Sequence, residues 1–286
     1  YLYPNDQAGG RNGLIAKSAR PDGPFEVCNW SKENPNVSDG VLQFDPAVFV
    51  DDDGRVYGYW GFERSYAAEL DPATMATVKP GTEIVEDMIS SRDQSGVFRF
   101  FEASSIRKIK DKYVFIYSRW TEEGEFGLPN TNYTLAYAYS DQPLGPWTYG
   151  GTIIDGRGRE LDEQGNVIAS ASVSGNTHGS ICEINGQWYV FYHRPPRGFG
   201  NARQAMVAPV KIEWDEKSVA DGGIVTSTGY NPYAENEEWI AEAANGDTYR
   251  GAEVTSEGFH IFGLDPYDYY SAGYACFMTN GQSMQD

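Results

Sequence analysis

The sequence predicts an all-β fold of repeated blades, a β-propeller, and three observations support this prediction. Aromatic residues make up 14% of the 286 residues and 32 glycines accompany them, a mixture that favours strands and tight turns over helices. Runs of strong helix formers with the helical period are scarce. The third observation is an internal repeat of β-hairpins, which is typical of propellers and other repeat folds.

Three segments of the chain share one hairpin pattern. In each, a polar residue at the second position and a few small residues precede an alternating run, a polar turn and a strand rich in aromatic residues. The segments are FDPAVFVDDDGRVYGYWG from Phe44, FEASSIRKIKDKYVFIYS from Phe101 and THGSICEINGQWYVFYHR from Thr177. Asp53-Gly54 and Asn185-Gly186 are strong hairpin turns, and the acidic residues 51–53 are interpreted as a solvated turn. The turn at 110–112 rests on the alignment of the segments.

The two ends of the chain are interpreted as parts of further blades. Tyr1-Leu2-Tyr3 resembles the end of an aromatic strand, so the polar residue of its unit would precede Tyr1 by roughly a dozen residues. Residues 250–277 are interpreted as the closing blade. We therefore expect residues 1–286 to form one propeller domain that lacks its first inner strand and ends near its last blade.

Asp45, Glu102 and His178 occupy the same position of the repeat. Equivalent positions of successive blades have equivalent positions relative to the propeller axis. If this position lies at the axial end of the innermost strand, two carboxylates and an imidazole converge on one central pocket. A hydrophobic core does not need such a trio, because buried unpaired charges cost free energy. The shared position therefore indicates a functional site. Taken singly, Asp45 could open a turn, Glu102 could be an exposed strand residue and His178 a core histidine.

The formal net charge of −19 disfavours nucleic acid and anionic membrane surfaces as partners. A neutral partner, such as an oligo- or polysaccharide, is compatible with this charge. The three cysteines form neither a disulfide framework nor a zinc motif. No stretch is long and apolar enough to span a membrane, and no organic cofactor is expected.

Nearly the whole chain resembles glycoside hydrolase family 43. The resemblance rests on three motifs in the family's order, each on a blade hairpin: Phe44-Asp45-Pro46, Phe101-Glu102-Ala103 and Thr177-His178-Gly179-Ser180. It implies a five-bladed propeller that cleaves arabinose- or xylose-containing polysaccharides with inversion, using three carboxylates. An extracellular or periplasmic location fits such an enzyme.

The resemblance also implies a role for each matching residue. Glu102 would be the general acid, and Asp45 would raise the pKa of this acid and orient it. His178 is similar to an axial histidine that is linked through water to a calcium ion. Arg203 is similar to an arginine that contacts the sugar. The aspartate that serves as general base has no counterpart in the sequence, so a truncated N-terminus is expected.

Three aromatic residues are candidates for stacking on a sugar ring. Trp60 and Trp120 follow the aromatic strands of two blades, and Phe101 directly precedes Glu102. Burial within the blades explains the two tryptophans equally well. The loops that are expected to decide which sugar is bound lie at 61–66, 119–133 and 195–201.

We expect a β-xylosidase or α-L-arabinofuranosidase that inverts the anomeric centre, with acid and base roughly 6.5–9.5 Å apart. Two alternatives stay open. A retaining fructan hydrolase would place its two carboxyl groups roughly 5–5.5 Å apart. A sugar-binding propeller without catalysis would have no aspartate at the upstream position.

Overall fold

The computed structural model describes most of the first 213 residues and short parts of the remainder. The described residues are 1–4, 13–30, 33, 38–157, 159–169, 177–194, 203–213, 225–227, 252–255 and 258–261. They form strands and connecting turns, with one short 3₁₀ turn, η1 (Glu125–Gly127), and no α-helix. The prediction of an all-β fold is therefore confirmed for this part of the chain. Within these residues, no helix has the length and apolar character that crossing a membrane requires.

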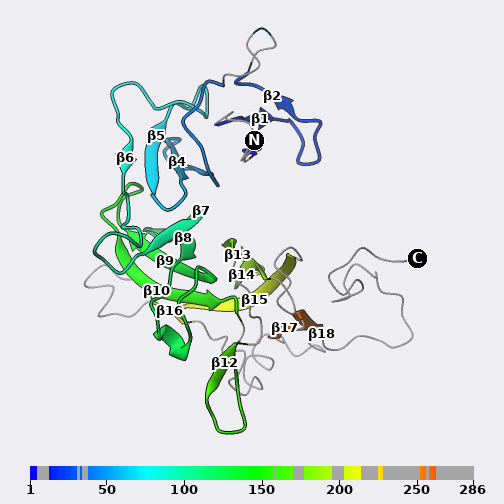
Figure 1. Ribbon diagram of the computed structural model, residues 1–286. Helices are drawn as coiled ribbons and strands as arrows, with labels where there is room; N and C mark the ends of the chain where they lie inside the picture. Colours follow the sequence, from blue (N-terminus) through cyan, green and yellow to red (C-terminus); the bar gives the residue numbers. More distant parts are fainter. Residues whose placement is uncertain are drawn as a thin grey trace, which may run out of the picture. The chain divides into compact units, whose positions relative to one another are not determined.

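Three four-stranded sheets are the main elements of the fold (Figure 1). The first contains β3 (Ala47–Val50), β4 (Val56–Trp60), β5 (Tyr66–Leu70) and β6 (Val85–Glu86). The second contains β7 (Phe100–Ile109), β8 (Lys112–Arg119), β9 (Thr134–Ser140) and β10 (Thr148–Asp155). The third contains β13 (Gly179–Ile184), β14 (Gln187–Arg194), β15 (Gln204–Glu213) and β16 (Val225–Ser227). In each sheet every strand lies beside the next strand of the chain, the meander that is typical of a propeller blade.

The first two strands of each four-stranded sheet form the hairpins that the repeat predicts. β3 pairs antiparallel with β4, β7 with β8 and β13 with β14. The turn residues Gly54, Lys110 and Asn185 have positive φ angles, as tight hairpin turns require. Three two-stranded sheets accompany them: β1 (Ala16–Lys17) with β2 (Glu26–Val27), β11 (Arg159–Leu161) with β12 (Val167–Ala169), and β17 (Ala252–Thr255) with β18 (Gly258–Ile261).

The chain divides into two compact units. The first comprises Tyr1–Arg119 and Tyr137–Gly150, and the second comprises Trp120–Ala136 and Gly151–Asp286. The sheet of β3 to β6 and the β7–β8 hairpin belong to the first unit, and the sheet of β13 to β16 belongs to the second. One propeller domain over residues 1–286 stays a prediction.

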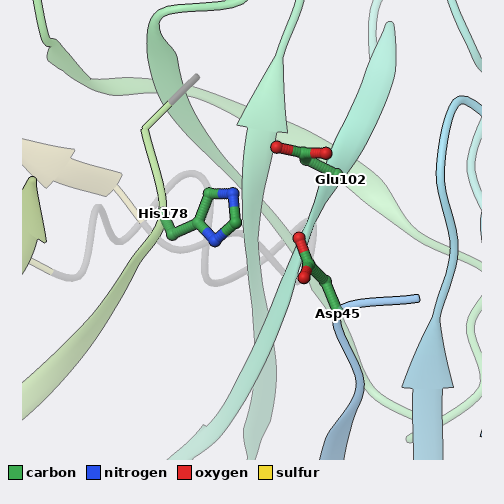
Figure 2. Close-up of side chains that lie close together, drawn as sticks. All are labelled: Asp45, Glu102 and His178. Carbon is green, nitrogen blue, oxygen red and sulfur yellow. The ribbon is translucent and has the colours of Figure 1, made fainter. Parts of the chain in front are cut away.

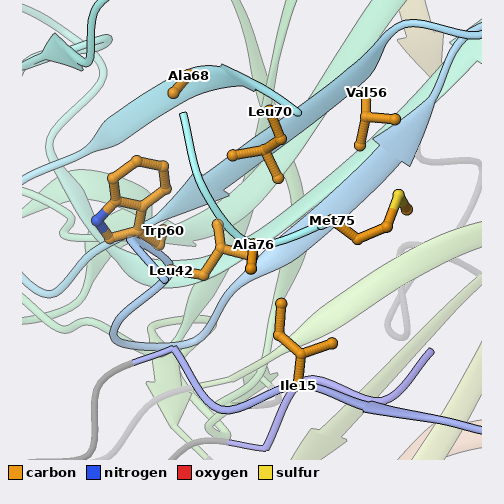
Figure 3. Close-up of a cluster of buried hydrophobic side chains, with 8 residues drawn as sticks. All are labelled: Ile15, Leu42, Val56, Trp60, Ala68, Leu70, Met75 and Ala76. Carbon is orange, nitrogen blue, oxygen red and sulfur yellow. The ribbon is translucent and has the colours of Figure 1, made fainter. Parts of the chain in front are cut away.

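Strand β4 of the first sheet is buried on both faces, because both alternating sets of its side chains are apolar or aromatic. On one face, Val56 and Trp60 of β4 belong to a cluster of eight buried residues (Figure 3). The other members are Ile15, Leu42, Ala68, Leu70, Met75 and Ala76. Gly58 leaves room on this face for a leucine side chain, which an added Cβ would meet at 2.6 Å. On the opposite face, Tyr59 packs on Phe115 of β8 with 5.7 Å between ring centroids.

Aromatic rings fill the space around β8, in which every residue is buried. Phe115 and Tyr117 stack with 5.5 Å between ring centroids, and Phe115 also contacts Phe100 and Trp147. The Tyr117 hydroxyl donates a hydrogen bond to the Phe98 carbonyl at 2.9 Å, which satisfies the polar group of this side chain. Full burial contributes roughly 1.5–3 kcal/mol for each large apolar side chain, so these rings hold the second sheet firmly.

The turn between β3 and β4 is less solvated than predicted, because Asp51 is buried. Its carboxylate accepts hydrogen bonds from Nζ of Lys108 in β7, at 2.8 Å, and from the hydroxyl of Tyr113 in β8. Burial acts to raise the pKa of Asp51, but the hydrogen bonds from Lys108 and Tyr113 outweigh burial and the pKa lies below its ordinary value. The solvated interpretation is wrong for Asp51 and holds for Asp52 and Asp53, which are exposed. The network ties the turn of the first sheet to the hairpin of the second.

Glu69 of β5 is the centre of another ion-pair network. The Arg55 guanidinium donates to its two carboxylate oxygens at 3.0 and 2.7 Å, and Nζ of Lys79 donates to one of them at 2.6 Å. Only 5% of the Glu69 side chain is exposed. The hydrogen bond from Arg55 is the largest influence, and together with Lys79 it overcomes burial and lowers the pKa of Glu69 to about 2.

We expect Glu69→Gln to lower the free energy of unfolding at pH 7 by about 2 kcal/mol, a figure reduced for the solvent around its partners. The folded pKa of Glu69, about 2, lies below the unfolded value of about 4.3. The carboxylate therefore stabilises the fold above about pH 4.3, and this contribution is lost as the pH falls toward 2. Urea unfolding of wild type and variant over a pH series measures the difference between them.

The exposed Glu26 of β2 supplies the control, since Glu26→Gln should change the free energy of unfolding by less than about 0.5 kcal/mol. A difference between wild type and Glu69→Gln that is as large at pH 3 as at pH 7 would contradict the assigned network. If Glu69 contributed only through the packing of its side chain, which glutamine keeps, wild type and variant would have the same free energy of unfolding at pH 3 and at pH 7.

Candidate functional site

Asp45 lies two residues before β3, at the open end of the β3–β4 hairpin. Its φ angle of 45° is in the left-handed region, which aspartate tolerates better than most residues do. The carbonyl of Phe44 accepts a hydrogen bond from the N–H of Gly61 at 2.9 Å. This bond fixes the backbone directly before Asp45. The position from which the half-buried side chain of Asp45 extends is therefore defined.

Glu102 lies within β7, and only 2% of the residue is exposed. It is opposite Ser118 of β8, and the pairing register shifts on both sides of it. Ala103 has a φ angle of 65°, a left-handed conformation inside a strand. Such bulges interrupt the alternation of a strand and redirect a side chain. The local backbone of β7 therefore sets the direction of the Glu102 carboxylate.

The carboxylates of Asp45 and Glu102 are directed into the same space within the first unit (Figure 2). An oxygen of one lies within 4.8 Å of an oxygen of the other. The sheets that carry them are joined through contacts between β3 and β7. The first unit therefore holds two carboxylates side by side, one buried and one half-buried.

Phe101, a predicted sugar contact, is buried and packs against a neighbouring ring. It is 7% exposed and packs against Phe62 with 5.2 Å between ring centroids. Phe62 also packs against Phe44, at 5.0 Å, and is itself exposed. Sequence reasoning pointed to the loop 61–66 without singling out Phe62. The available signal was its place directly after the glycine that ends the aromatic strand.

The two predicted tryptophans have different surroundings. Trp60 is 3% exposed, stacks on Tyr66 at 5.9 Å and belongs to the buried cluster of the first sheet. This placement favours packing within the blade over contact with a sugar. Trp120 directly follows β8, is half-buried and belongs to the second unit. Its contact with a sugar stays a prediction.

His178, also labelled in Figure 2, belongs to the second unit and directly precedes β13. Its backbone N–H donates to Nδ1 of His193 at 3.5 Å, and the two rings lie 5.2 Å apart. The buried Thr177 donates its hydroxyl to the His193 carbonyl at 2.8 Å. At Gly179 an added Cβ would meet a β14 carbonyl at 2.6 Å, so this motif fits closely against β14. Arg203 is exposed and directly precedes β15.

Comparison with known proteins gives one family and a set of relatives. Residues 1–218 match the family described as Glycosyl hydrolases family 43. A xylosidase/arabinosidase of Thermoclostridium stercorarium is 37% identical over 180 residues, which cover 59% of this chain and 36% of that protein. An arabinoxylan arabinofuranohydrolase of Paenibacillus polymyxa is 26% identical over 268 residues, which cover 86% of this chain and 40% of that protein.

Similar solved structures include a family 43 arabinoxylan arabinofuranohydrolase of Bacillus subtilis in complex with cellotetraose. It has a TM-score of 0.49 and 22% identity, and the match covers 77% of this chain and 45% of that chain.

A third relative by sequence is a xylosidase/arabinosidase of Bacteroides ovatus. It is 27% identical, with 75% of this chain and 65% of that protein covered. The chain thus spans between 36% and 65% of the length of these curated relatives.

We expect Ala103→Val to lower the free energy of unfolding by about 2–3 kcal/mol, because a β-branched residue fits poorly in the left-handed region. Ala103→Gly should change it by less than about 1 kcal/mol, since glycine adopts this conformation freely. Urea unfolding of the two variants measures the difference. Equal stability of the valine and glycine variants would contradict the left-handed bulge beside Glu102.

Proposed function

Because the chain belongs to glycosyl hydrolases family 43, we propose that it hydrolyses glycosidic bonds of xylose- or arabinofuranose-containing oligo- and polysaccharides. The observation that carries this proposal is the pair of Asp45 and Glu102, two carboxylates within 4.8 Å of which the second is buried. The names of the relatives, xylosidase/arabinosidase and arabinoxylan arabinofuranohydrolase, support the substrate class. The family match favours this reaction over the alternative of a fructan hydrolase.

Glu102 is proposed as the general acid. Its proton passes to the glycosidic oxygen while the bond between this oxygen and the anomeric carbon breaks, so that the leaving sugar departs with a new hydroxyl. A water molecule attacks the anomeric carbon from the opposite face and gives a proton to a general base, which inverts the configuration. Burial of Glu102 keeps bulk water from competing for the proton. We assign no general base among the described residues.

Asp45 is proposed to assist the acid rather than to act as the base. One of its oxygens lies within 4.8 Å of an oxygen of Glu102, and the assisting role follows from the position of Asp45 in the family's order of motifs. A carboxylate directly beside the buried Glu102 is placed to orient the acid for proton transfer. The hydrogen bond from the Gly61 N–H to the Phe44 carbonyl fixes the backbone directly before this carboxylate.

A five-bladed propeller is the arrangement proposed for the whole domain, and the three four-stranded sheets support it. In such a propeller His178, which shares the repeat position of Asp45 and Glu102, would serve the same site. The expected calcium ion takes roughly six to eight oxygen ligands. The described contact of the His178 ring within its unit is another imidazole, that of His193. An imidazole offers no oxygen ligand, so the proposed link between His178 and a calcium ion would run through water, and no step of the reaction is derived through the ion.

Arg203 and Trp120 are proposed as substrate contacts of the second unit. Arg203 is exposed, and its guanidinium offers five N–H donors, which suit the hydroxyls of a neutral sugar. Trp120 is half-buried and offers an apolar ring face. Trp60 is not included, because its ring belongs to the buried cluster.

We expect Glu102→Gln to reduce activity by an amount that depends on the leaving group. Hydrolysis of a xylo- or arabinoxylo-oligosaccharide, whose leaving alcohol needs a proton, should fall about 10²–10⁴-fold. Hydrolysis of the corresponding dinitrophenyl glycoside should fall far less, because its leaving group departs as a stable anion. Measurements of kcat/KM on both substrates test this, with Glu26→Gln as the control. Equal losses on both substrates would show that Glu102 is not the acid.

The reaction class is tested by assaying an aryl β-xyloside and an aryl α-L-arabinofuranoside with and without azide, with circular dichroism as a check of folding. Azide is small enough to act as nucleophile where no base activates a water molecule. An inverted product, or activity that appears only with azide, supports an inverting glycosidase. A retained product would overturn inversion. A folded chain that is inactive under every condition would overturn the proposal in favour of a sugar-binding propeller.

A further inference from the structure

The loop between β4 and β5 contacts the backbone directly before each carboxylate. The N–H of Gly61 donates to the Phe44 carbonyl at 2.9 Å, and the N–H of Glu63 donates to the Phe101 carbonyl at 2.6 Å. These two carbonyls belong to the residues that immediately precede the proposed acid and its carboxylate neighbour. The loop therefore bridges the two segments, and its central residue, Phe62, is placed beside both.

The conformation of this loop is narrowly defined. Gly61 has a φ angle of 138°, and a Cβ there would lie 1.8 Å from the Arg64 carbonyl oxygen, so the turn requires glycine. Glu63 is left-handed, with a φ angle of 54°. The Arg64 guanidinium forms an ion pair with the Asp87 carboxylate. The backbone at position 62 is thus held in a fixed place. This limits the conformational entropy that the loop would lose when a ligand contacts it.

Phe62 is the exposed member of a cluster of three rings. Its ring lies 5.0 Å from that of Phe44 and 5.2 Å from that of Phe101, and 48% of the residue is exposed. Single exposed apolar residues are common and need no function. Phe62 differs from them because two rings support it beside a pair of carboxylates. An exposed ring beside polar groups suits a sugar, whose C–H face packs on the ring while its hydroxyls stay in water.

We infer that Phe62 stacks on the leaving-group sugar, the sugar whose glycosidic oxygen takes the proton of Glu102. This inference rests on the proposed function and deepens it. The leaving oxygen must lie against Glu102 when the proton passes, so the leaving sugar lies near the segment of β7 that contains Phe101. Phe62 packs on Phe101 there. Its exposed position also suits a group that departs into solvent, whereas a fully enclosed ring would suit the sugar that is retained longer.

Phe62→Ala is expected to lower kcat/KM about tenfold for a substrate with a sugar leaving group, which corresponds to about 1.4 kcal/mol. The substrate is xylobiose or an arabinose-substituted xylo-oligosaccharide, whichever the wild-type chain cleaves. The matching glycosyl fluoride has a leaving group without a ring, so its kcat/KM should fall less than about twofold. Phe62→Tyr keeps a stacking face and should keep the wild-type ratio between the two substrates.

Phe25→Ala is the matched control, because it removes another exposed phenylalanine, next to β2, and should change neither substrate. Equal losses on both substrates in Phe62→Ala would mean that Phe62 positions the acid. Unchanged kinetics would mean that it contacts no leaving group. Either result overturns the inference and leaves the proposed function intact. A wild-type chain that cleaves neither substrate, with or without azide, would overturn the proposed function and this inference with it.

Discussion

Two carboxylates within 4.8 Å of each other, one of them almost fully buried, cost free energy that the surrounding structure must offset. The offset comes from the sheets that carry them. Glu102 is paired across β7 and β8 with Ser118, and the rings around Phe115 hold this hairpin against its neighbours. The Asp51–Lys108 ion pair fastens the two sheets at the turn end of the β3–β4 hairpin, opposite the end where Asp45 lies. The candidate site thus depends on strand pairing, ring packing and an ion pair that lie mostly outside the carboxylates themselves.

The backbone around the carboxylates contains three of the nine non-glycine residues with positive φ angles in the described part of the chain. Asp45, Glu63 and Ala103 all have positive φ angles although none is glycine, and each such residue costs roughly 1–2 kcal/mol. Strain of this kind persists only where neighbouring structure over-determines it, and it is frequent at functional sites. Here the neighbours are the two hydrogen bonds of the β4–β5 loop and the pairing of β7 with β8.

Local sequence patterns predicted the hairpins well, because a tight turn fixes the register of both its strands. The same register predicted that Asp45 and Glu102 lie together, as they do. Local patterns did not predict the burial of Asp51, because its hydrogen-bond partner is distant in sequence. The carboxylate accepts a hydrogen bond from Lys108, 57 residues away. Trp60 shows a further limit, since an aromatic residue at the end of a strand has the same local signature in a core and at a sugar site. The five-bladed arrangement and the roles of His178, Arg203 and Trp120 stay predictions, because they depend on segments that are distant in sequence.

The loop that presents Phe62 is held by backbone groups, by Gly61 and by the Arg64–Asp87 pair, and not by the side chain at position 62. Exchange of that side chain would therefore keep the backbone hydrogen bonds, the glycine turn and the ion pair of the loop. In evolutionary terms, a change of one codon can replace the exposed ring while the rest of the loop stays the same. The position is a place where a lineage can vary an exposed side chain beside two carboxylates without changing the contacts of the loop that presents it.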